Sequence, residues 1–269
     1  MKRILLTLSA AVLLSAEVID KIVATVNDIP VTSYEVAKLA KNLKISDSKA
    51  LGFILDQKLI QSEIKKRGIE ADDFEIENAM EKIAKQNGLS LLEFKNILMQ
   101  KAQYDKLRKK IKEDLLKEKL FNQIVQTKLN ISEEEIKNYY DNHKNDFKTF
   151  KTIQITKYSA NNKKILNEIK KNPLSNTNVQ TSTQNYTFDK LPIGLVFLFK
   201  QTKQGEFTPI INDALGYSMY YVEKKEGETY IPFGKVKTAI ANKLAAQKRE
   251  MILKEYFNKL KNRAYIKFY

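Results

Sequence analysis

The chain has 269 residues and a formal net charge of +15, from 47 Lys and Arg against 32 Asp and Glu. Hydrophobic residues make up 43% of it, enough to bury a core, which excludes a wholly disordered polycation. Cysteine is absent and histidine occurs once, which excludes disulfide scaffolds, thiol nucleophiles, cysteine zinc sites and multi-histidine metal cages. Neither GxGxxG nor GxxxxGK[ST] occurs, so the common nucleotide-binding loops are excluded as well. We therefore expect no cofactor and no metal site.

Residues 1–16 have the pattern of a cleaved secretory signal peptide. Lys2 and Arg3 precede an apolar run over residues 4–14, and the small residues Ser15 and Ala16 follow it. A membrane anchor is the alternative, but the run is shorter than the ~20 residues that a bilayer requires. We expect cleavage after Ala16 and a periplasmic location, where a lack of cysteine avoids unwanted thiol oxidation.

Residues 17–130 are expected to form a helical unit that begins with one strand or hairpin. Residues 18–26 are rich in β-branched side chains, and Asn27-Asp28 is a turn signal. Thr32 and Glu35 form a capping box, which predicts the start of the first helix. Further helices are expected around residues 51–59, 74–84, 91–98 and 104–129. Gly68 is expected to end the helix around 51–59, and Asn87-Gly88 to end the helix around 74–84. A capping box of Ser90 and Glu93 predicts the start of the helix around 91–98.

Residues 131–226 are expected to form a small α+β domain. Ser132 and the three glutamates after it cap a short helix, and the alternating segment 152–158 predicts a strand. The order that follows is a helix at 161–171, a polar loop at 172–184, an apolar helix at 191–199 opened near Pro192, and strands at 207–211 and 217–222.

Residues 227–269 are expected to return to the helical unit. Pro232 precedes a long helix whose apolar residues recur in steps of four or eight: Val236, Ile240, Leu244, Ile252, Tyr256 and Leu260. Residues 264–269 have the composition of a strand, and the strand at 18–26 is the partner we expect for it. The predicted fold class is α+β: a mainly helical module built from both chain ends, with an inserted small α+β domain.

Several segments resemble a known family. Val18–Val36, Ile54–Ile60, Glu81–Ser90 and the ending at Ala264–Ile266 are similar to the chaperone module of SurA-type periplasmic proteins, in the same order over nearly the whole chain. Residues 131–226 resemble a degenerate parvulin-type peptidyl-prolyl isomerase domain. Its marks are Leu191-Pro192 with Leu195, Lys203–Ile210 and Gly216–Val222. The resemblance implies an ATP-independent chaperone that binds unfolded outer-membrane proteins.

The resemblance also implies candidate site residues. The parvulin pattern has a histidine in its first strand facing another in its last strand, and the matching positions here are Gln154 and Ser218. A third family position has no match in the shortened loop 172–185, and the glycine-rich segment before the proline pocket is missing. By resemblance, Tyr186, Leu191 and Leu195 line a proline pocket; the alternative is that they are ordinary core residues. We therefore expect weak or absent isomerase activity.

The remaining polar features have simpler explanations. His143 lies in a polar turn and is interpreted as a solvated loop residue, and Glu133–Glu135 suit the first turn of a helix. Residues 227–269 carry ten basic and three acidic side chains, typical of a solvated lysine face on an amphipathic helix. Arginine accounts for only five of the 47 basic residues, which disfavours nucleic-acid binding.

Three functions compete at this point. The leading hypothesis is a chaperone that binds unfolded or extended polypeptides, with outer-membrane proteins in their unfolded state as the expected clients. It is expected to bind no nucleic acid and to make at most peripheral membrane contact. The second is an active prolyl isomerase that uses residues 131–226. The third is a basic protein that binds nucleic acid or a surface, for which binding would collapse in moderate salt.

Overall fold

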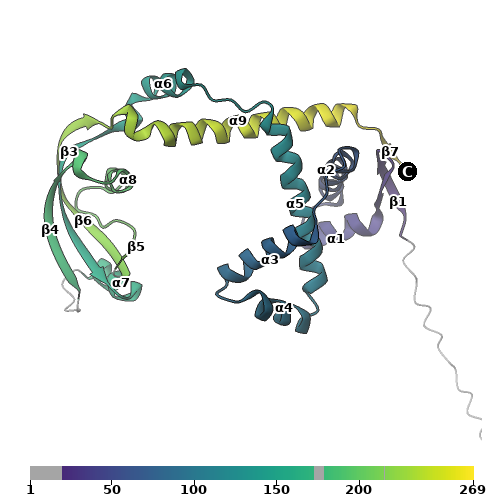
Figure 1. Cartoon of the computed structure of the whole chain (residues 1–269), viewed down its shortest axis with the longest axis horizontal. Helices are drawn as coiled ribbons and strands as arrows, with labels where there is room; N and C mark the ends of the chain where they lie inside the picture. Colours follow the sequence, from purple (N-terminus) through teal and green to yellow (C-terminus); the bar gives the residue numbers. More distant parts are fainter. Residues whose placement is uncertain (1–19, 173–178, 215) are drawn as a thin grey trace, which may run out of the picture. The chain divides into compact units, whose positions relative to one another are not determined.

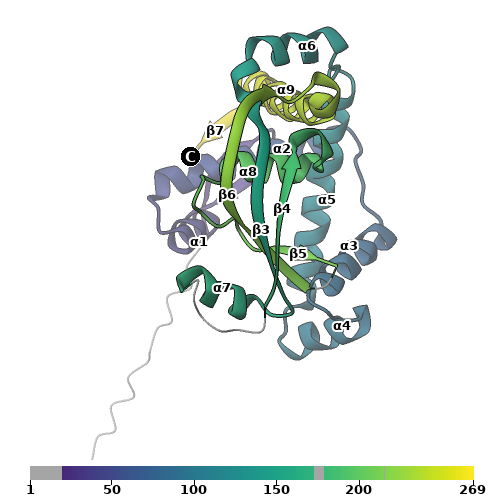
Figure 2. The same ribbon diagram turned by 90° about the vertical axis from the view of Figure 1, so that its left-hand side faces the viewer.

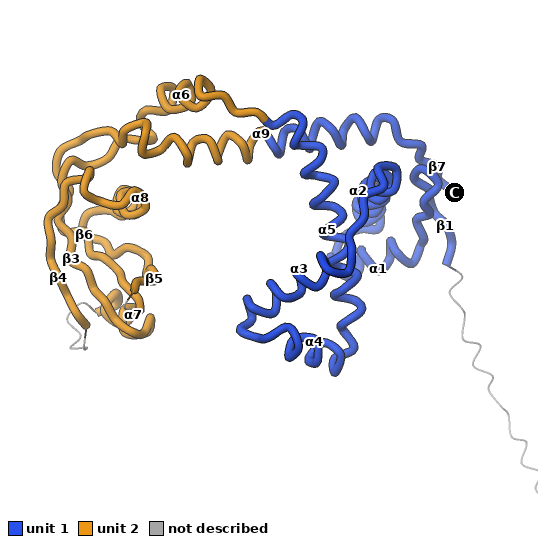
Figure 3. Tube along the Cα trace, in the orientation of Figure 1, with its two compact units in different colours: residues 1–129, 249–269 blue, residues 130–248 orange. Residues whose placement is uncertain are grey.

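The computed structural model describes residues 20–172, 179–214 and 216–269. It is a mixed α+β chain, in agreement with the predicted fold class (Figure 1). The chain forms two compact units, coloured separately in Figure 3. The first, called the helical unit below, comprises the chain up to Leu129 together with Arg249–Tyr269. The second, called the inserted unit, comprises Asn130–Lys248.

The two ends of the chain meet in a three-stranded antiparallel sheet of the helical unit. Strands β1 (Ile22–Val26) and β2 (Ile29–Thr32) form a hairpin, and β7 (Ile266–Phe268) pairs with the other edge of β1, beside which it lies in Figure 1. The hairpin turn consists of Asn27 and Asp28, which both have positive φ, as a two-residue turn of this twist requires. The predicted pairing of the two chain ends is confirmed.

Five helices follow the hairpin at the predicted places. They are α1 (Ser33–Leu43), α2 (Asp47–Lys66), α3 (Asp73–Gln86), α4 (Leu91–Gln100) and α5 (Tyr104–Gln126). The capping boxes predicted at Thr32 and Ser90 are both formed, each by a hydroxyl and the glutamate three residues later. Gly68 and Gly88 have positive φ just after α2 and α3, a backbone conformation that glycine adopts at little cost.

In the helical unit, the ion pair of Glu63 with Arg67 at the end of α2 is hydrogen-bonded to Tyr256 of helix α9 (Phe233–Arg263). Glu63 accepts hydrogen bonds from the Tyr256 hydroxyl at 2.5 Å and from Arg67 Nε at 2.6 Å. Burial acts to raise the pKa of Glu63, but the hydrogen bonds from Tyr256 and Arg67 outweigh it, and the pKa lies below its ordinary value. The paired carboxylate is therefore stable although Glu63 is buried, beside a Tyr256 ring that packs on an apolar cluster.

The inserted unit contains a four-stranded antiparallel sheet in the order β4-β3-β6-β5 (Figure 2). The strands are β3 (Lys148–Ala160), β4 (Gln180–Thr187), β5 (Ile211–Asp213) and β6 (Gly216–Tyr230). Its helices are α6 (Glu133–Asn142), α7 (Lys163–Lys171) and α8 (Ile193–Gln201), and Ser132 forms the predicted cap of α6.

Two expectations for this sheet were wrong. Residues 180–184, expected in a polar loop, belong to edge strand β4, and the expected strand at 207–211 is replaced by β5 and an isolated bridge at Phe207. Strand β4 is exposed at every position except Tyr186, so its sequence has the polar composition that also characterises loops. The part of the expected loop at 173–178 lies outside the described residues.

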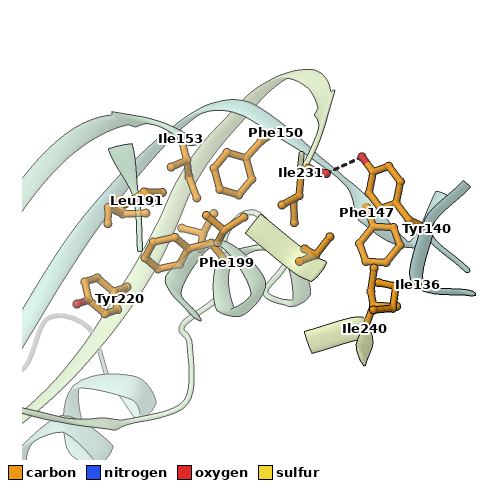
Figure 4. Packing of buried hydrophobic residues seen from close by; sticks show 14 residues of the cluster. Ile136, Tyr140, Phe147, Phe150, Ile153, Leu191, Phe199, Tyr220, Ile231 and Ile240 are labelled. Carbon is orange, nitrogen blue, oxygen red and sulfur yellow. Dashed lines mark hydrogen bonds between the residues drawn. The ribbon is translucent and has the colours of Figure 1, made fainter. Parts of the chain in front are cut away.

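The core of the inserted unit extends onto helix α9. Side chains of the sheet and α8, including Ile153, Phe199 and Tyr220, pack in one cluster with Ile240 of α9, and the Tyr140 hydroxyl donates a hydrogen bond of 2.7 Å to the Ile231 carbonyl (Figure 4). The packing division of the chain therefore falls at residue 248, whereas the expected domain boundary lies between residues 226 and 227. The boundaries expected at residues 130 and 226 stay a prediction.

Candidate functional site

The three residues predicted to line a proline pocket lie around one pocket of the inserted unit. Its volume is about 270 Å³. Tyr186 comes from β4, Leu191 precedes α8, and Leu195 lies in its first turns. The complete lining is Ile155, Lys157, Ser182, Gln184, Tyr186, Lys190, Leu191, Pro192, Leu195 and Tyr220. Residues 180–185 of the expected loop belong to strand β4, which supplies Ser182 and Gln184 to this lining.

Strand alternation explains which side chains reach the pocket. Successive residues of a strand point to opposite faces, so Ile153, Ile155 and Lys157 of β3 share one face. Tyr186 is the direct partner of Ile153 across the ladder and therefore lies on the same face. Pro192 is the N-cap residue of α8, where its missing N–H and fixed φ suit the start of a helix.

A polar cluster lies beside the apolar wall of the pocket. Lys157 Nζ donates a hydrogen bond to Asp213 Oδ2 at 2.5 Å, and the Ser218 hydroxyl donates to the same oxygen at 2.6 Å. The backbone N–H of Ala214 donates to Asp213 Oδ1 at 2.6 Å. The bonds from Lys157, Ser218 and Ala214, in that order, lower the pKa of Asp213 to about 2. The same pairing with Asp213 raises the pKa of Lys157, while burial raises that of Tyr220.

The two candidate catalytic positions are not brought together. Gln154 is flanked in the sheet by Asn185 and Lys224, whereas Ser218 pairs with Ser159. Five positions of β3 separate the two, about 17 Å along the strand. Gln154 also follows Ile153 and precedes Ile155, both buried in the core, so it points to the opposite face of the sheet. The expectation that Gln154 and Ser218 face each other across a site is therefore corrected.

Sequence reasoning missed Lys157 and Tyr220, which do lie at the pocket. A signal for Lys157 exists in the sequence, because it follows Ile153 and Ile155 at intervals of two and so shares the inward face. Its position predicts a lysine that points toward the core and needs an acidic partner. Its partner Asp213 is 56 residues away, and no local pattern connects the two.

The arrangement can hold an apolar ring or side chain but offers little for proton transfer. Leu191, Leu195 and Tyr186 provide an apolar wall, and Lys157, which also lines the pocket, is paired with Asp213. An aspartate with a pKa of about 2 is a weak base at neutral pH, and Lys157 keeps its proton beside it. The described side chains around the pocket are therefore suited to contact with an apolar group.

The other features considered in the sequence have structural roles. The His143 ring is stacked on Tyr139 at 4.1 Å after the end of α6, with its Nδ1 2.9 Å from the Tyr139 carbonyl. Glu133 and Glu135 make ion pairs with Lys237 and Lys248. Within residues 20–172, 179–214 and 216–269, no cluster of His, Asp or Glu is arranged to hold a metal ion. In the same ranges, no helix is long and apolar enough to cross a membrane.

Comparison with known proteins places this architecture in a class. Residues 133–225 match the family described as Cj1289-like, C-terminal domain. A solved structure from work on the virulence factor PEB4 and the periplasmic protein Cj1289, two SurA-like chaperones of Campylobacter jejuni, is 30% identical and has a TM-score of 0.64. The match covers 92% of this chain and 98% of that chain. The fold and the inserted domain thus define a chaperone of the SurA-like class.

Two curated relatives of this chain are also proteins that assist folding, by their names a foldase and a chaperone. A foldase protein PrsA of Caldanaerobacter subterraneus is 25% identical over 82% of this chain and 70% of its own length. A chaperone SurA of Hydrogenovibrio crunogenus is 31% identical over 45% of this chain and 30% of its own length. The chain therefore spans less than a third of the SurA relative that it matches. It belongs to the SurA-like chaperones.

Proposed function

We propose that the protein is a periplasmic, ATP-independent chaperone that binds unfolded outer-membrane proteins. The observation that carries this proposal is the set of large apolar side chains exposed on the helical unit, among them Phe74 at 73% and Leu92 at 70% of their full exposure. Apolar surface of this kind gains free energy when an unfolded segment covers it. The SurA-like relatives support the chaperone role, and the signal-peptide pattern at residues 1–16 supports export.

We further propose that the inserted unit has weak or no prolyl-isomerase activity. Twisting an X–Pro bond requires the ring to be gripped while a barrier of ~20 kcal/mol is lowered. The pocket beside Leu195 supplies the apolar contact, but Gln154 lies on the far face of the sheet and Ser218 is bonded to Asp213. Binding of prolyl or other apolar side chains without rapid turnover is the function that this geometry supports.

The second candidate is an active peptidyl-prolyl isomerase. The observation in its favour is the pocket itself, which brings Tyr186, Leu191 and Leu195 together as a proline pocket requires. The two candidate functions differ in the concentration at which the protein has its effect. A chaperone slows client aggregation at near-equal concentration without ATP, whereas an isomerase accelerates proline isomerisation at catalytic concentration.

Both activities should be measured on the same preparation. We expect the protein to suppress aggregation of a chemically unfolded outer-membrane barrel protein, and to leave the isomerisation rate of a proline peptide near its uncatalysed value. Leu195→Lys places a charge in the pocket, and Gln154→Ala changes the far face as a matched control. Rapid turnover that is lost in Leu195→Lys and kept in Gln154→Ala would make the protein an enzyme. Failure to suppress aggregation would overturn the chaperone proposal.

A further inference from the structure

The helical unit contains an open, mainly apolar groove on α2. Its volume is about 420 Å³, and no part of the inserted unit contributes to it. One wall is a face of α2, and the other comes from the end of α9 and from β7. The lining residues are Lys49, Gly52, Phe53, Leu55, Asp56, Leu59, Lys261 and Ile266.

The periodicity of α2 and β7 builds the groove. Gly52, Asp56 and Leu59 follow one another at intervals of four and three, so they lie on one face of α2. Ile266 of β7 pairs with Val26, and Phe268 lies two residues further along the same face of the strand. Phe268 is 61% exposed, and Phe53 next to Gly52 is 52% exposed. The groove therefore has one exposed aromatic ring, Phe53, in its own lining, and a second, Phe268, follows on the strand that supplies Ile266.

Gly52 forms an open position in this wall. It lies inside the 20-residue helix α2, where glycine is the least favourable residue except proline. A Cβ atom added at Gly52 would meet no atom within 4 Å, so no neighbour in the folded chain requires glycine here. No positive φ explains it either. The absence of a side chain instead leaves the α2 backbone accessible to a molecule that enters the groove.

The charges around the groove favour an acidic ligand. Asp56 is the one carboxylate of the lining, and Lys261 pairs with it at 2.7 Å. Lys49 is exposed and makes no ion pair with any residue of the described ranges. A ligand with a carboxylate beside its apolar group would meet an unpaired cation and a neutralised anion.

We propose that this groove binds an extended polypeptide segment with an aromatic side chain over Gly52 and an acidic side chain next to it, near Lys49. The inference rests on the proposed function and names the class of client segment and its docking site. An aromatic ring fits a site in which Gly52 leaves one wall without a side chain and the ring of Phe53 is part of the lining. A second copy of the chain is the competing occupant, and the test distinguishes it.

The test is fluorescence anisotropy with the full chain and labelled 12-residue Gly/Ser peptides that carry Phe-Asp, Phe-Lys or Ala-Asp at their centre. We expect the Phe-Asp peptide to bind most tightly. Gly52→Leu fills the groove and should weaken its binding about tenfold, which corresponds to about 1.4 kcal/mol. Gln57→Leu adds the same side chain at an exposed position of α2 outside the groove and should leave binding within about twofold. Lys49→Ala should remove the preference for Asp over Lys.

Folding and the proposed function are separated by parallel measurements. Leucine is a better helix former than glycine, so Gly52→Leu should melt at or above the temperature of the unaltered chain, which excludes unfolding as the cause of lost binding. Equal binding of the peptide by Gly52→Leu and by the unaltered chain would overturn the inference. So would sedimentation that shows a dimer for the unaltered chain and a monomer for Gly52→Leu, because the groove would then bind a second copy of the chain. If peptides bind in a Gly52-dependent way but aggregation is not suppressed, the groove stands and the chaperone proposal fails. If Gly52→Leu suppresses aggregation fully, the chaperone proposal stands and the groove is not its client site.

Discussion

Lys157 and Asp213 show how single residues set the character of the pocket. The lysine points inward from β3, and its charge is tolerated because the aspartate of β5 accepts its hydrogen bond. Side-chain identity was available from the sequence, and alternation along β3 places Lys157 on the inward face. The pairing itself could not be predicted, because β3 and β5 are not adjacent in the sheet and the partner is far away in sequence. The same limit produced the mistaken facing of Gln154 and Ser218.

The low pKa of Asp213 predicts how the inserted unit responds to acid. Its folded pKa of about 2 lies below the ordinary 3.8, because Lys157, Ser218 and Ala214 favour the ionised carboxylate. The stability that this provides is fully present above pH 3.8 and is lost as the pH falls toward 2. We expect a carboxyl NMR titration of Asp213 to have its midpoint near 2, and Lys157→Met to move the midpoint upward. A midpoint near 3.8 in the unaltered chain would contradict the ion pair.

At the level of elements, most helices were predictable, whereas strands β4 and β5 were not. The capping boxes at Thr32, Ser90 and Ser132 mark helix starts because a hydroxyl and a glutamate satisfy the first free N–H groups. Strand β4 has no such local signal. Its polar residues face solvent at the edge of the sheet, and its strand conformation depends on pairing with β3, which lies at least 20 residues earlier.

The pairing of β7 with β1 predicts that the last residues stabilise the helical unit. The Tyr265 carbonyl accepts from the Asn27 N–H at 2.9 Å, and Ile266 packs on the cluster around Ala24 and Val26. Deleting residues 264–269 should lower the free energy of unfolding of this unit by about 2–3 kcal/mol, mostly through the lost burial of Ile266. Hydrogen exchange should show faster exchange in β1 and α2 and none of this change in β3 or β6. Lys267→Ser, which keeps the strand, is the control, and unchanged exchange in β1 after the deletion would contradict the prediction.

At the scale of the whole molecule, the apolar stripe of α9 explains why the domain boundary is hard to infer from sequence. The stripe is regular along its length, but its residues pack in different hydrophobic clusters. Val236 and Ile240 are buried in the inserted unit. Ile252 packs with residues of α5, and Leu260 packs in the cluster of the three-stranded sheet β2-β1-β7. A periodic pattern shows that a helix has an apolar face, but it does not show where along the helix the partner changes.

This division predicts that the place of excision decides whether the helical unit folds alone. Removing residues 131–226 would leave Val236, Ile240 and Leu244 without the core that covers them. Removing residues 130–248 leaves none of these exposed, and a short Gly-Ser linker can join the ends, because Lys248 Nζ lies 2.5 Å from the Asn130 carbonyl. We expect the second excision to give a helical, monomeric protein with a cooperative melt. The first should melt lower or aggregate, since exposed apolar stripes promote association.

The two excisions also separate the roles of the units. If clients bind to the helical unit, the variant that lacks residues 130–248 should still slow aggregation and should bind the Phe-Asp peptide with unchanged affinity, because every lining residue of the Gly52 groove remains in it. Circular dichroism and sedimentation would establish that it is folded before binding is measured. A folded variant that has lost peptide binding would move the client site to the inserted unit. The opposite result, in which the variant lacking residues 130–248 is unfolded and the variant lacking residues 131–226 is folded, would place the boundary at residue 226. The helical unit would then need the amino-terminal half of α9 in order to fold.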